Sequence, residues 1–476
     1  MKKFKLRSKE WFDNPDDPGL TALYLERYLN YGLKREDLQS GKPIIGIAQS
    51  GSDLSPCNRH FQALSKTIKD GIREAGGVPM EFPTHPIQET GKRPTAALDR
   101  NLSYLSLVEV LYGYPIDGVI LTTGCDKTTP AALMAAATVN IPSIVLSGGP
   151  MLDGNYKGKK AGSGTIIWEA RKLHAKGEID YDEFMDMAAA SAPSIGHCNT
   201  MGTASSMNSI AEALGMSLPG GAIIPAPYKE RTDISFKTGK RIVEMVFENL
   251  TPSKIMTKEA FENAVYVASA IGASSNCPPH LTAIARHMGV DFNLDQWEKL
   301  GHSIPLLANC QPAGEHLMEG FFKAGGIPAI MKELIKDKKL NVKALTVTGK
   351  TMEENLNIKI DVNRDVIKSY ENPLSHNAGF IVMKSNFFSS AVMKTSVISS
   401  EFRERYLSNK DSLNIFEVKA VVFEGPEDYH ARINDDNLKI DENSILIIRG
   451  CGPVGYPGSA EVVNMQPPDK LLKKGI

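Results

Sequence analysis

The chain has no long apolar run, no strong net charge and no compact arrangement of cysteines. Its 476 residues contain no stretch near the roughly 20 consecutive apolar residues that a membrane-spanning helix needs. The basic start at Met1–Arg7 has no apolar segment behind it, so it does not look like a secretory signal. A net charge of −1 argues against a nucleic-acid surface built on bulk charge. We therefore expect neither a nucleic acid nor a membrane as partner.

Cysteine is scarce, because only six residues are scattered over the whole length. A disulfide framework in a small secreted domain has compact and regular spacing. The scattering instead favours a reducing compartment. We therefore expect a cytoplasmic protein in which some thiols are free to bind metal.

Alternating short strands and helices are the main feature that is present. Hydrophobic content of 42% and charged content of 23% are typical of globular proteins, and the length predicts two to four domains. From Pro43 onward the alternation predicts an α/β fold, in which helices cover both faces of a parallel sheet. The predicted strands are residues 43–48, 78–82, 117–121 and 143–146, and the predicted helices include residues 61–72, 95–112, 131–139 and 205–216.

The pattern changes after residue 357. Strand-like runs at residues 359–362, 379–383, 416–423 and 444–448 are separated by turn residues, with few long helical patterns between them. This change predicts a large α/β domain over residues 1–357 and a smaller β-barrel domain over residues 358–476.

Three consecutive reactive side chains occupy one predicted strand-to-helix loop. Cys125, Asp126 and Lys127 follow the strand at 117–121 and precede the helix at 131–139. Ligands of open α/β sheets usually bind at this edge, and a helix N-terminus favours a thiolate, a carboxylate or a bound anion. For this triplet alone, the alternative is a buried structural cysteine beside a surface ion pair.

Two further cysteines occupy similar loops. Cys57 lies between the first strand and its helix, and Cys198 lies just ahead of a helix that should begin near Thr203. Because such loops can meet at one edge of a parallel sheet, we expect the three sulfurs to converge. Three thiolates suit a soft metal or an iron–sulfur cluster, and three ligands would leave one iron open to a substrate oxygen. A zinc-binding α/β enzyme with the same cysteines is the competing hypothesis.

Two carboxylates are candidates for a harder metal. Asp126 and Glu89 are predicted on neighbouring loops of the sheet edge, and carboxylate oxygens are ligands that Mg²⁺ selects. Each of them alone is more typical of a solvated loop residue.

A family resemblance is carried by several of these motifs. The segment Cys125–Ala131 matches the first signature of the dihydroxy-acid and sugar-acid dehydratases, the family that includes 6-phosphogluconate dehydratase. Cys57 and Cys198 stand in the flanking contexts of that family. Pro86–Thr95 and Gly450–Gly458 look most similar to the aldonic-acid branch, which includes xylonate and arabonate dehydratases. The resemblance extends over essentially the whole chain.

The resemblance implies cofactors, residue roles and a reaction. A [2Fe–2S] cluster would be held by three cysteines and Mg²⁺ by four further residues, of which the lysine is carbamylated in some members and counts as a catalytic residue. The matching positions are Cys57, Cys125 and Cys198 for the cluster and Glu89, Asp126, Lys127 and Glu461 for Mg²⁺. The implied enzyme removes water from a 2,3-dihydroxy sugar acid to give a 2-oxo-3-deoxy acid, and it forms homodimers or homotetramers.

One family feature is missing from this sequence. The second signature, Asp-Gly-Arg-x-Ser-Gly, is expected shortly after Met465–Pro468, and its serine is regarded as the base that removes the C2 proton. The chain ends at Ile476. We therefore expect an incomplete barrel with Leu471 and Leu472 poorly covered, and weak catalysis. A non-catalytic, cluster- or metal-binding remnant or subunit is a further competing hypothesis.

The remaining cysteines and two histidines favour milder interpretations. Cys277 and Cys310 are more typical of small buried apolar groups than of ligands. Cys451 is close in sequence to the predicted ligand Glu461 and could line the site, but a fourth thiolate would close the cluster. His85 and His197 border the predicted site, either as hydrogen-bond donors behind the ligands or as ordinary loop residues.

Overall fold

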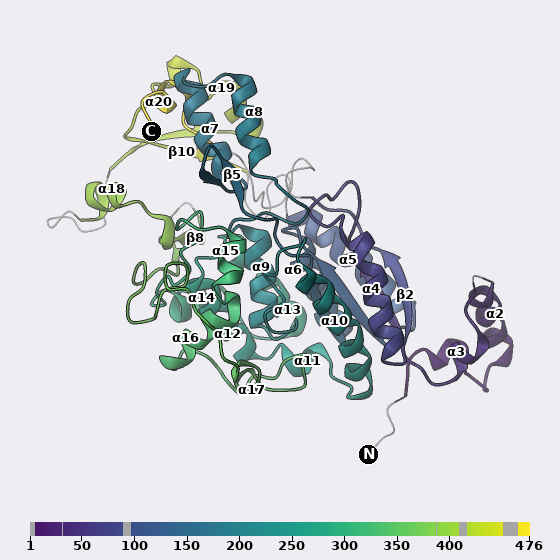
Figure 1. Ribbon diagram of the computed structural model, residues 1–476. Helices are drawn as coiled ribbons and strands as arrows, with labels where there is room; N and C mark the ends of the chain where they lie inside the picture. Colours follow the sequence, from purple (N-terminus) through teal and green to yellow (C-terminus); the bar gives the residue numbers. More distant parts are fainter. Residues whose placement is uncertain (1–4, 31, 89–96, 387, 409–416, 451–464) are drawn as a thin grey trace.

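A parallel four-stranded sheet forms the centre of the molecule. The computed structural model describes residues 5–30, 32–88, 97–386, 388–408, 417–450 and 465–476 (Figure 1). The strand order is β2, β1, β3, β4, and all neighbouring pairs are parallel. The strands are β1 (Ile44–Gln49), β2 (Val78–Pro83), β3 (Gly118–Thr123) and β4 (Ser143–Ser147). β1, β3 and β4 are buried throughout, as expected for a parallel sheet covered on both faces.

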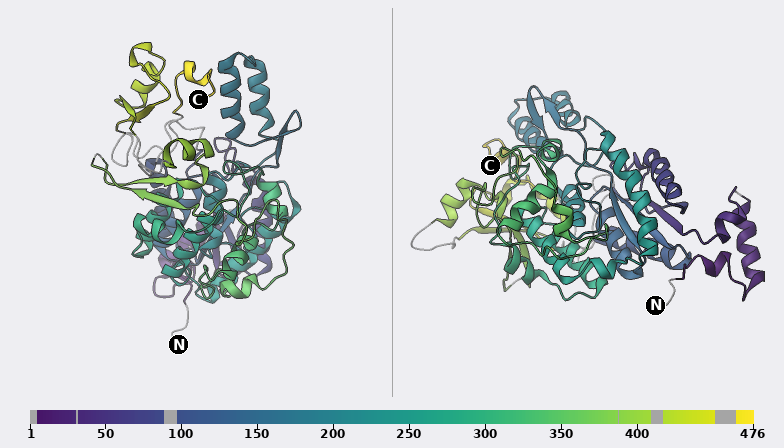
Figure 2. Two further views of the ribbon diagram at one scale, coloured as in Figure 1. Left: turned by 90° about the vertical axis from the view of Figure 1, so that its left-hand side faces the viewer. Right: turned by 60° about the horizontal axis from the view of Figure 1, so that its bottom comes forward.

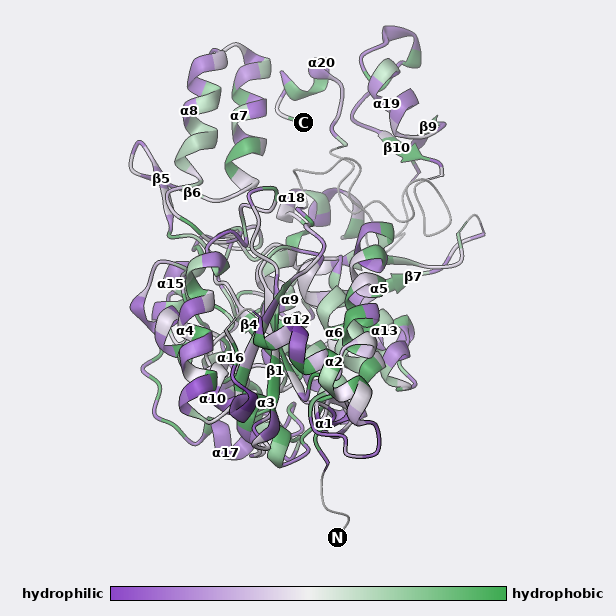
Figure 3. Cartoon of the chain, turned by 90° about the vertical axis from the view of Figure 1, so that its right-hand side faces the viewer, coloured by the Kyte–Doolittle hydropathy of each residue, from purple (hydrophilic) through white to green (hydrophobic). Residues whose placement is uncertain are grey.

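Helices cover both faces of the sheet, which confirms the predicted α/β fold. One face carries α4 (Phe61–Glu74) and α10 (Lys229–Phe247), and the other carries α5 (Ala97–Gly113) and α6 (Thr128–Val139). Gly71 and Gly239 bring α4 and α10 close together, since a Cβ at Gly71 would lie 2.2 Å from the Phe236 carbonyl oxygen. Figure 3 shows the hydrophobic strand β1 beside α4 and α10, whose outer faces are largely hydrophilic.

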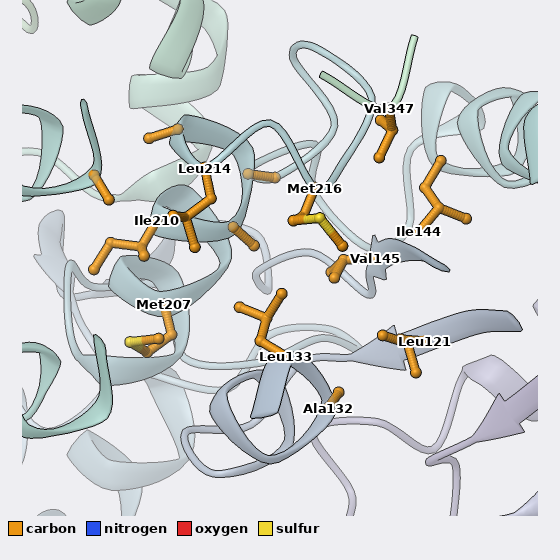
Figure 4. Close-up of a cluster of buried hydrophobic side chains, with 14 of the residues drawn as sticks. Leu121, Ala132, Leu133, Ile144, Val145, Met207, Ile210, Leu214, Met216 and Val347 are labelled. Atoms are coloured by element: carbon orange, nitrogen blue, oxygen red, sulfur yellow. The ribbon is translucent and has the colours of Figure 1, made fainter. Parts of the chain in front are cut away.

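A second helical layer extends the core beyond β4. Figure 4 shows Leu133 of α6 between Met207 and Ile210 on one side and Val145 of β4 and Leu121 of β3 on the other, and all five side chains are buried. Met207 and Ile210 belong to α9 (Thr203–Ala213), which confirms the helix predicted over 205–216. The other helices of this layer are α11 (Pro252–Ile255), α12 (Lys258–Ala270), α13 (Cys277–Met288), α14 (Leu294–Gly301), α15 (Met318–Lys323), α16 (Gly326–Lys336) and α17 (Met352–Leu356).

Two excursions leave this core. The N-terminal helices project from it as an arm (Figure 1), and a hairpin with two paired helices follows β4 and stands beside the C-terminal elements (Figure 2). The arm contains α1 (Lys9–Phe12), α2 (Pro18–Leu29) and α3 (Arg35–Gln39), and the second excursion contains β5 (Gly154–Tyr156), β6 (Lys159–Ala161), α7 (Thr165–Lys176) and α8 (Tyr181–Ala190).

The C-terminal part differs from the predicted barrel. Its described residues form an antiparallel pair and a separate parallel pair of strands, together with short helices. These elements are β7 (Phe380–Met383), β8 (Ala391–Lys394), α18 (Ser400–Phe402), β9 (Lys419–Phe423), α19 (Pro426–Arg432), β10 (Ser444–Ile448) and α20 (Asp469–Leu472). The expected strand at 359–362 is absent, because Ile360 and Val362 pack against the main core without a strand partner.

The expected exposure of Leu471 and Leu472 is also wrong. These side chains are 4% and 6% exposed. Leu471 packs in a small cluster with Phe423 and Tyr429, and α20 lies against α7. The second excursion thus helps to cover the C-terminal leucines. No helix in the described ranges is both long and apolar enough to cross a membrane.

Acidification should destabilise the fold through His60. This side chain lies at the start of α4 and its Nε2 is 2.9 Å from the Gly148 carbonyl oxygen, while burial lowers its pKa to about 4. In the unfolded chain the His60 imidazole takes up a proton near pH 6.5, whereas in the folded chain it takes up this proton only near pH 4. The contribution of His60 to the free energy of unfolding is therefore complete above pH 6.5. It is lost as the pH falls toward 4, by up to about 1.4 kcal/mol per pH unit.

Thermal unfolding midpoints measured between pH 7 and pH 4.5 test this expectation. His60→Gln keeps an amide that can reach Gly148 and removes the titration, so its midpoint should fall less on acidification than that of the unaltered chain. Equal falls in both proteins would contradict the assignment to His60.

Candidate functional site

The site lies where the strand order of the sheet reverses. The chain moves from β1 outward to β2, whereas β3 and β4 follow on the other side of β1. The loops after the adjacent strands β1 and β3 therefore lead to helices on opposite faces and leave a crevice between them. Ligands of open α/β sheets bind at such a switch point. Cys57 follows β1, and Cys125 follows β3.

Cys198 reaches the same edge through the end of β4. The Pro150 segment just beyond β4 pairs with His197, whose backbone N–H donates to the Gly149 carbonyl oxygen at 3.0 Å. The buried guanidinium of Arg231 supports this edge by donating to the Ser147 carbonyl oxygen at 2.5 Å and the Gly221 carbonyl oxygen at 3.0 Å. These contacts hold the segment around His197, where the chain leaves the second excursion, next to the ends of the strands.

The structure brings the three thiols together. Cys57 is within hydrogen-bonding reach of Cys125 and within electrostatic reach of Cys198. The hydrogen bond with Cys125, together with burial, raises the pKa of the Cys57 thiol well above its ordinary value. Burial and the nearby charges of Asp126 and Cys125 raise the pKa of Cys198 to about 12. Without a cation these thiols stay protonated, whereas a bound metal would favour their thiolates and release protons.

Asn58 fixes the spacing between the first two cysteine loops. Its Oδ1 accepts a hydrogen bond from the Cys125 backbone N–H at 3.0 Å, and the side chain is fully buried. Gly124 makes this approach possible, because a Cβ there would lie 2.3 Å from Asn58 Oδ1. Since Oδ1 is occupied, the amide orientation is set and Nδ2 is directed elsewhere.

Asp126 and Lys127 are buried at the start of α6. Asp126 is 8% exposed and lies within electrostatic reach of Cys198, and Lys127 is fully buried. The Thr128 hydroxyl accepts from the Gly124 N–H at 3.1 Å and donates to the Cys125 carbonyl oxygen at 2.7 Å. A carboxylate and an amine withdrawn from solvent beside thiols are typical of a functional site rather than of a surface ion pair.

Several buried polar atoms beside the cysteines have no hydrogen-bond partner in the described part of the chain. They include Asn58 Nδ2, Gln88 Oε1 and His197 Nε2. Buried polar groups in folded proteins are nearly always paired, so these unpaired atoms would suit a bound ligand, ion or water. His197 donates to no cysteine sulfur here. Its Nδ1 lies 3.0 Å from the Cys198 carbonyl oxygen, and burial lowers its pKa to about 3.

The other candidate residues divide into three groups. Cys277 and Cys310 are buried in the main hydrophobic core, in agreement with their milder interpretation, and burial raises the pKa of Cys310. His85 is half-buried. Glu89, Glu461 and Cys451 lie outside the described residues.

Sequence reasoning missed three residues that contact the cysteines. Asn58 directly follows Cys57, and Gln88 precedes the predicted ligand Glu89, so adjacency was an available signal. Ser163, which is within hydrogen-bonding reach of Cys198, lies on the second excursion. It is not adjacent in sequence to any candidate ligand, so nothing in the sequence pointed to it.

Replacing Gly124 with alanine should disrupt the cysteine site. The new methyl group would overlap Asn58 Oδ1, which cannot withdraw while it holds the Cys125 N–H. We expect the purified variant to contain less bound metal than the unaltered protein. Gly113→Ala is the matched control, because no atom lies within 4 Å of its added Cβ. Retention of wild-type metal content by Gly124→Ala would show that this close approach is dispensable.

Comparison with known proteins gives the family of the chain. Residues 42–355 match the N-terminal model of the dihydroxy-acid/6-phosphogluconate dehydratases, and residues 365–476 match the C-terminal model. The chain is 60% identical over 472 residues to the D-xylonate dehydratase of Caulobacter vibrioides, covering 99% of this chain and 79% of that protein.

Two further relatives show the breadth of the similarity. Identity is 45% over 473 residues with the L-arabinonate dehydratase of Rhizobium leguminosarum bv. trifolii, covering 99% of this chain and 79% of that protein. It is 37% over 456 residues with the dihydroxy-acid dehydratase of Caldanaerobacter subterraneus subsp. tengcongensis, covering 94% of this chain and 79% of that protein. The chain belongs to the dihydroxy-acid/6-phosphogluconate dehydratase family and is a hydro-lyase.

Proposed function

We propose that this chain is a dehydratase of sugar acids that converts an aldonic acid such as xylonate or arabonate to its 2-oxo-3-deoxy acid. Its cofactors would be a [2Fe–2S] cluster held by Cys57, Cys125 and Cys198 and a Mg²⁺ ion. The proximity of three thiols at the switch point of the sheet, with Cys125 buried and Cys57 and Cys198 half-buried, carries this proposal. The names of the xylonate and arabinonate dehydratases that share 60% and 45% identity support the substrate class.

The donor set fits an iron–sulfur cluster better than a single zinc ion. Zinc with tetrahedral thiolates at about 2.3 Å requires sulfurs roughly 3.8 Å apart around one point. Cys57 is within hydrogen-bonding reach of Cys125 but only within electrostatic reach of Cys198. A cluster of two irons spreads its ligands over a wider group, and the unpaired Nδ2 of Asn58 suits an acceptor such as sulfide.

The Mg²⁺ site would use the residues that follow Cys125. Asp126 and Lys127 are buried next to the thiols, and Asp126 would supply the carboxylate oxygen that Mg²⁺ prefers. Lys127 would become an anionic oxygen donor only as a carbamate, in which form it would take part in catalysis. Glu89 and Glu461 complete the proposed ligand set.

The chemistry follows from these positions. When bound, Mg²⁺ would acidify the C2–H of a chelated hydroxy acid, and the open iron would assist departure of the C3 hydroxyl as a Lewis acid. Asn58 and Gly124 fix the separation of the two cysteine loops, and burial of Asp126 and Lys127 excludes water from the space beside them.

A product assay tests the proposal. The protein, purified anaerobically with Mg²⁺, should form 2-oxo-3-deoxy acids from xylonate, arabonate or gluconate faster than the corresponding oxo acid from a branched dihydroxy acid without further hydroxyls. No product from any sugar acid, in protein with a full complement of cluster and Mg²⁺, would contradict it. Colourless protein with stoichiometric zinc would favour the zinc enzyme instead.

A further inference from the structure

Two side chains place hydrogen-bond donors on the sulfurs of the cysteine site. Gln88 Nε2 lies 3.1 Å from Cys57 Sγ, and the Ser163 side chain is within hydrogen-bonding reach of Cys198. They reach the site from different segments, Gln88 from the loop after β2 and Ser163 from the turn between β6 and α7. Neither residue belongs to the proposed ligand sets.

Ser163 is held in place by the neck of the second excursion, which we define as the segments around Leu152 and Asn199 that connect the excursion to the core. Its backbone N–H donates to Asn199 Oδ1 at 2.8 Å, and the Asn199 Nδ2 donates to the Leu152 carbonyl oxygen at 2.9 Å. The Thr200 hydroxyl donates to the Ser163 carbonyl oxygen at 3.2 Å. These hydrogen bonds therefore connect the two segments of the neck next to Cys198 in the sequence.

The Ser163 hydroxyl has two acceptors within reach, Asn199 Oδ1 and the sulfur of Cys198. Its oxygen is also 3.1 Å from Asn199 Oδ1, but that oxygen already accepts the Ser163 N–H. When Cys198 is a thiol, the hydroxyl proton can point to Asn199. When Cys198 becomes a thiolate ligand, the proton can turn to the sulfur and leave Asn199 paired, at no cost in unsatisfied groups.

The orientation of Gln88 suits the same task. A thiolate sulfur has no proton to give, so the amide must present its N–H₂ to Cys57. Its Oε1 is buried and has no hydrogen-bond partner among the described residues, so within that part of the chain no contact of Oε1 favours the opposite orientation.

We propose that Gln88 and Ser163 are positioning residues that donate hydrogen bonds to the metal-bound sulfurs of Cys57 and Cys198 and raise the reduction potential of the cluster. The inference rests on the proposed function, since it requires the cluster. Hydrogen bonds to ligand sulfurs are among the factors that set iron–sulfur potentials. The reduced cluster carries more negative charge on its sulfurs, so a donor stabilises the reduced form more than the oxidised form. Withdrawal of charge from the sulfurs also strengthens the iron as a Lewis acid.

The test compares midpoint potentials and Fe–S resonance Raman bands of the reconstituted holoprotein. Ser163→Ala and Gln88→Leu should each shift the midpoint to more negative values, with about a tenfold change in the oxidised-to-reduced ratio at fixed potential, which is 59 mV for one electron. Ser163→Thr keeps a hydroxyl and should restore the wild-type values. Ser209→Ala, which removes a buried hydroxyl bonded only to the Ser205 carbonyl oxygen, should leave them unchanged.

Iron and sulfide content separates the two ways in which the idea can fail. Wild-type protein that binds no cluster would overturn the proposed function and this inference with it. Variants with full cluster content and unchanged potentials and Raman bands would overturn the inference alone. If Ser163→Ala does not fold, Gln88→Leu decides the outcome, because Gln88 is not part of the neck.

Discussion

Cys125→Ala is expected to remove the cluster and to lower the rate of dehydration by at least about 10³-fold, because a metal Lewis acid contributes several kcal/mol to such a barrier. Cys125 is the central thiol of the site. It is 2% exposed, lies within hydrogen-bonding reach of Cys57 and contributes to the raised pKa of Cys198. Its loss would leave only two of the three thiols that would hold the cluster.

Cys310→Ala is the matched control for this experiment. Cys310 is also buried, at 1% exposed, but it belongs to the main hydrophobic core. Its replacement should cost some stability and leave the iron content intact. Full iron, sulfide and visible absorption in Cys125→Ala would remove this cysteine from the proposed ligand set.

Asp126→Asn is expected to lower turnover by at least about 100-fold while the cluster is retained. The substitution keeps the size of the side chain and removes the negative charge that a hard cation selects. Changes behind the ligands of metal sites already cost 10–100-fold in affinity or activity, so a ligand itself should cost more. The Mg²⁺ concentration needed for half-maximal activity should rise.

Asp153→Asn serves as the control for Asp126→Asn. Asp153 is a partly buried carboxylate that accepts the Glu319 backbone N–H at 3.1 Å and does not belong to the proposed ligand set. Its variant should keep the wild-type response to Mg²⁺. An unchanged Mg²⁺ requirement in Asp126→Asn, measured by titration of metal-depleted protein, would exclude Asp126 as a ligand.

The sequence was sufficient to predict the α/β fold and the proximity of the loops that carry Cys57, Cys125 and Cys198. The reason is geometric, because loops after parallel strands share one sheet edge wherever they occur in the chain. The buried runs of β1, β3 and β4 were predicted within a few residues, since a strand covered on both faces is apolar throughout.

The contacts that shape the site were not accessible in the same way. Ser163 reaches Cys198 from an excursion outside the strand–helix alternation, and no periodicity links the two residues. The space between Gly124 and Asn58 depends on tenths of an ångström. These are properties of packing, which residue types and spacing do not encode locally.

The barrel prediction was limited by strand pairing, which the sequence pattern does not specify. Apolar runs at 379–383, 416–423 and 444–448 do contain strands over their described residues, but a strand pattern does not specify its partner. In the described residues β7 pairs with β8 and β9 with β10, in two separate sheets. Leu471 is buried because α20 packs on a neighbouring excursion, a contact between distant segments.

The most direct test of the central claim is the iron and acid-labile sulfide content of anaerobically reconstituted protein, with its visible absorption. The account predicts about two irons and two sulfides per chain for the unaltered protein, and neither in a variant with Cys57, Cys125 and Cys198 all replaced by alanine. A cluster that persists in that variant, or an unaltered chain that binds zinc and no iron under these conditions, would contradict it.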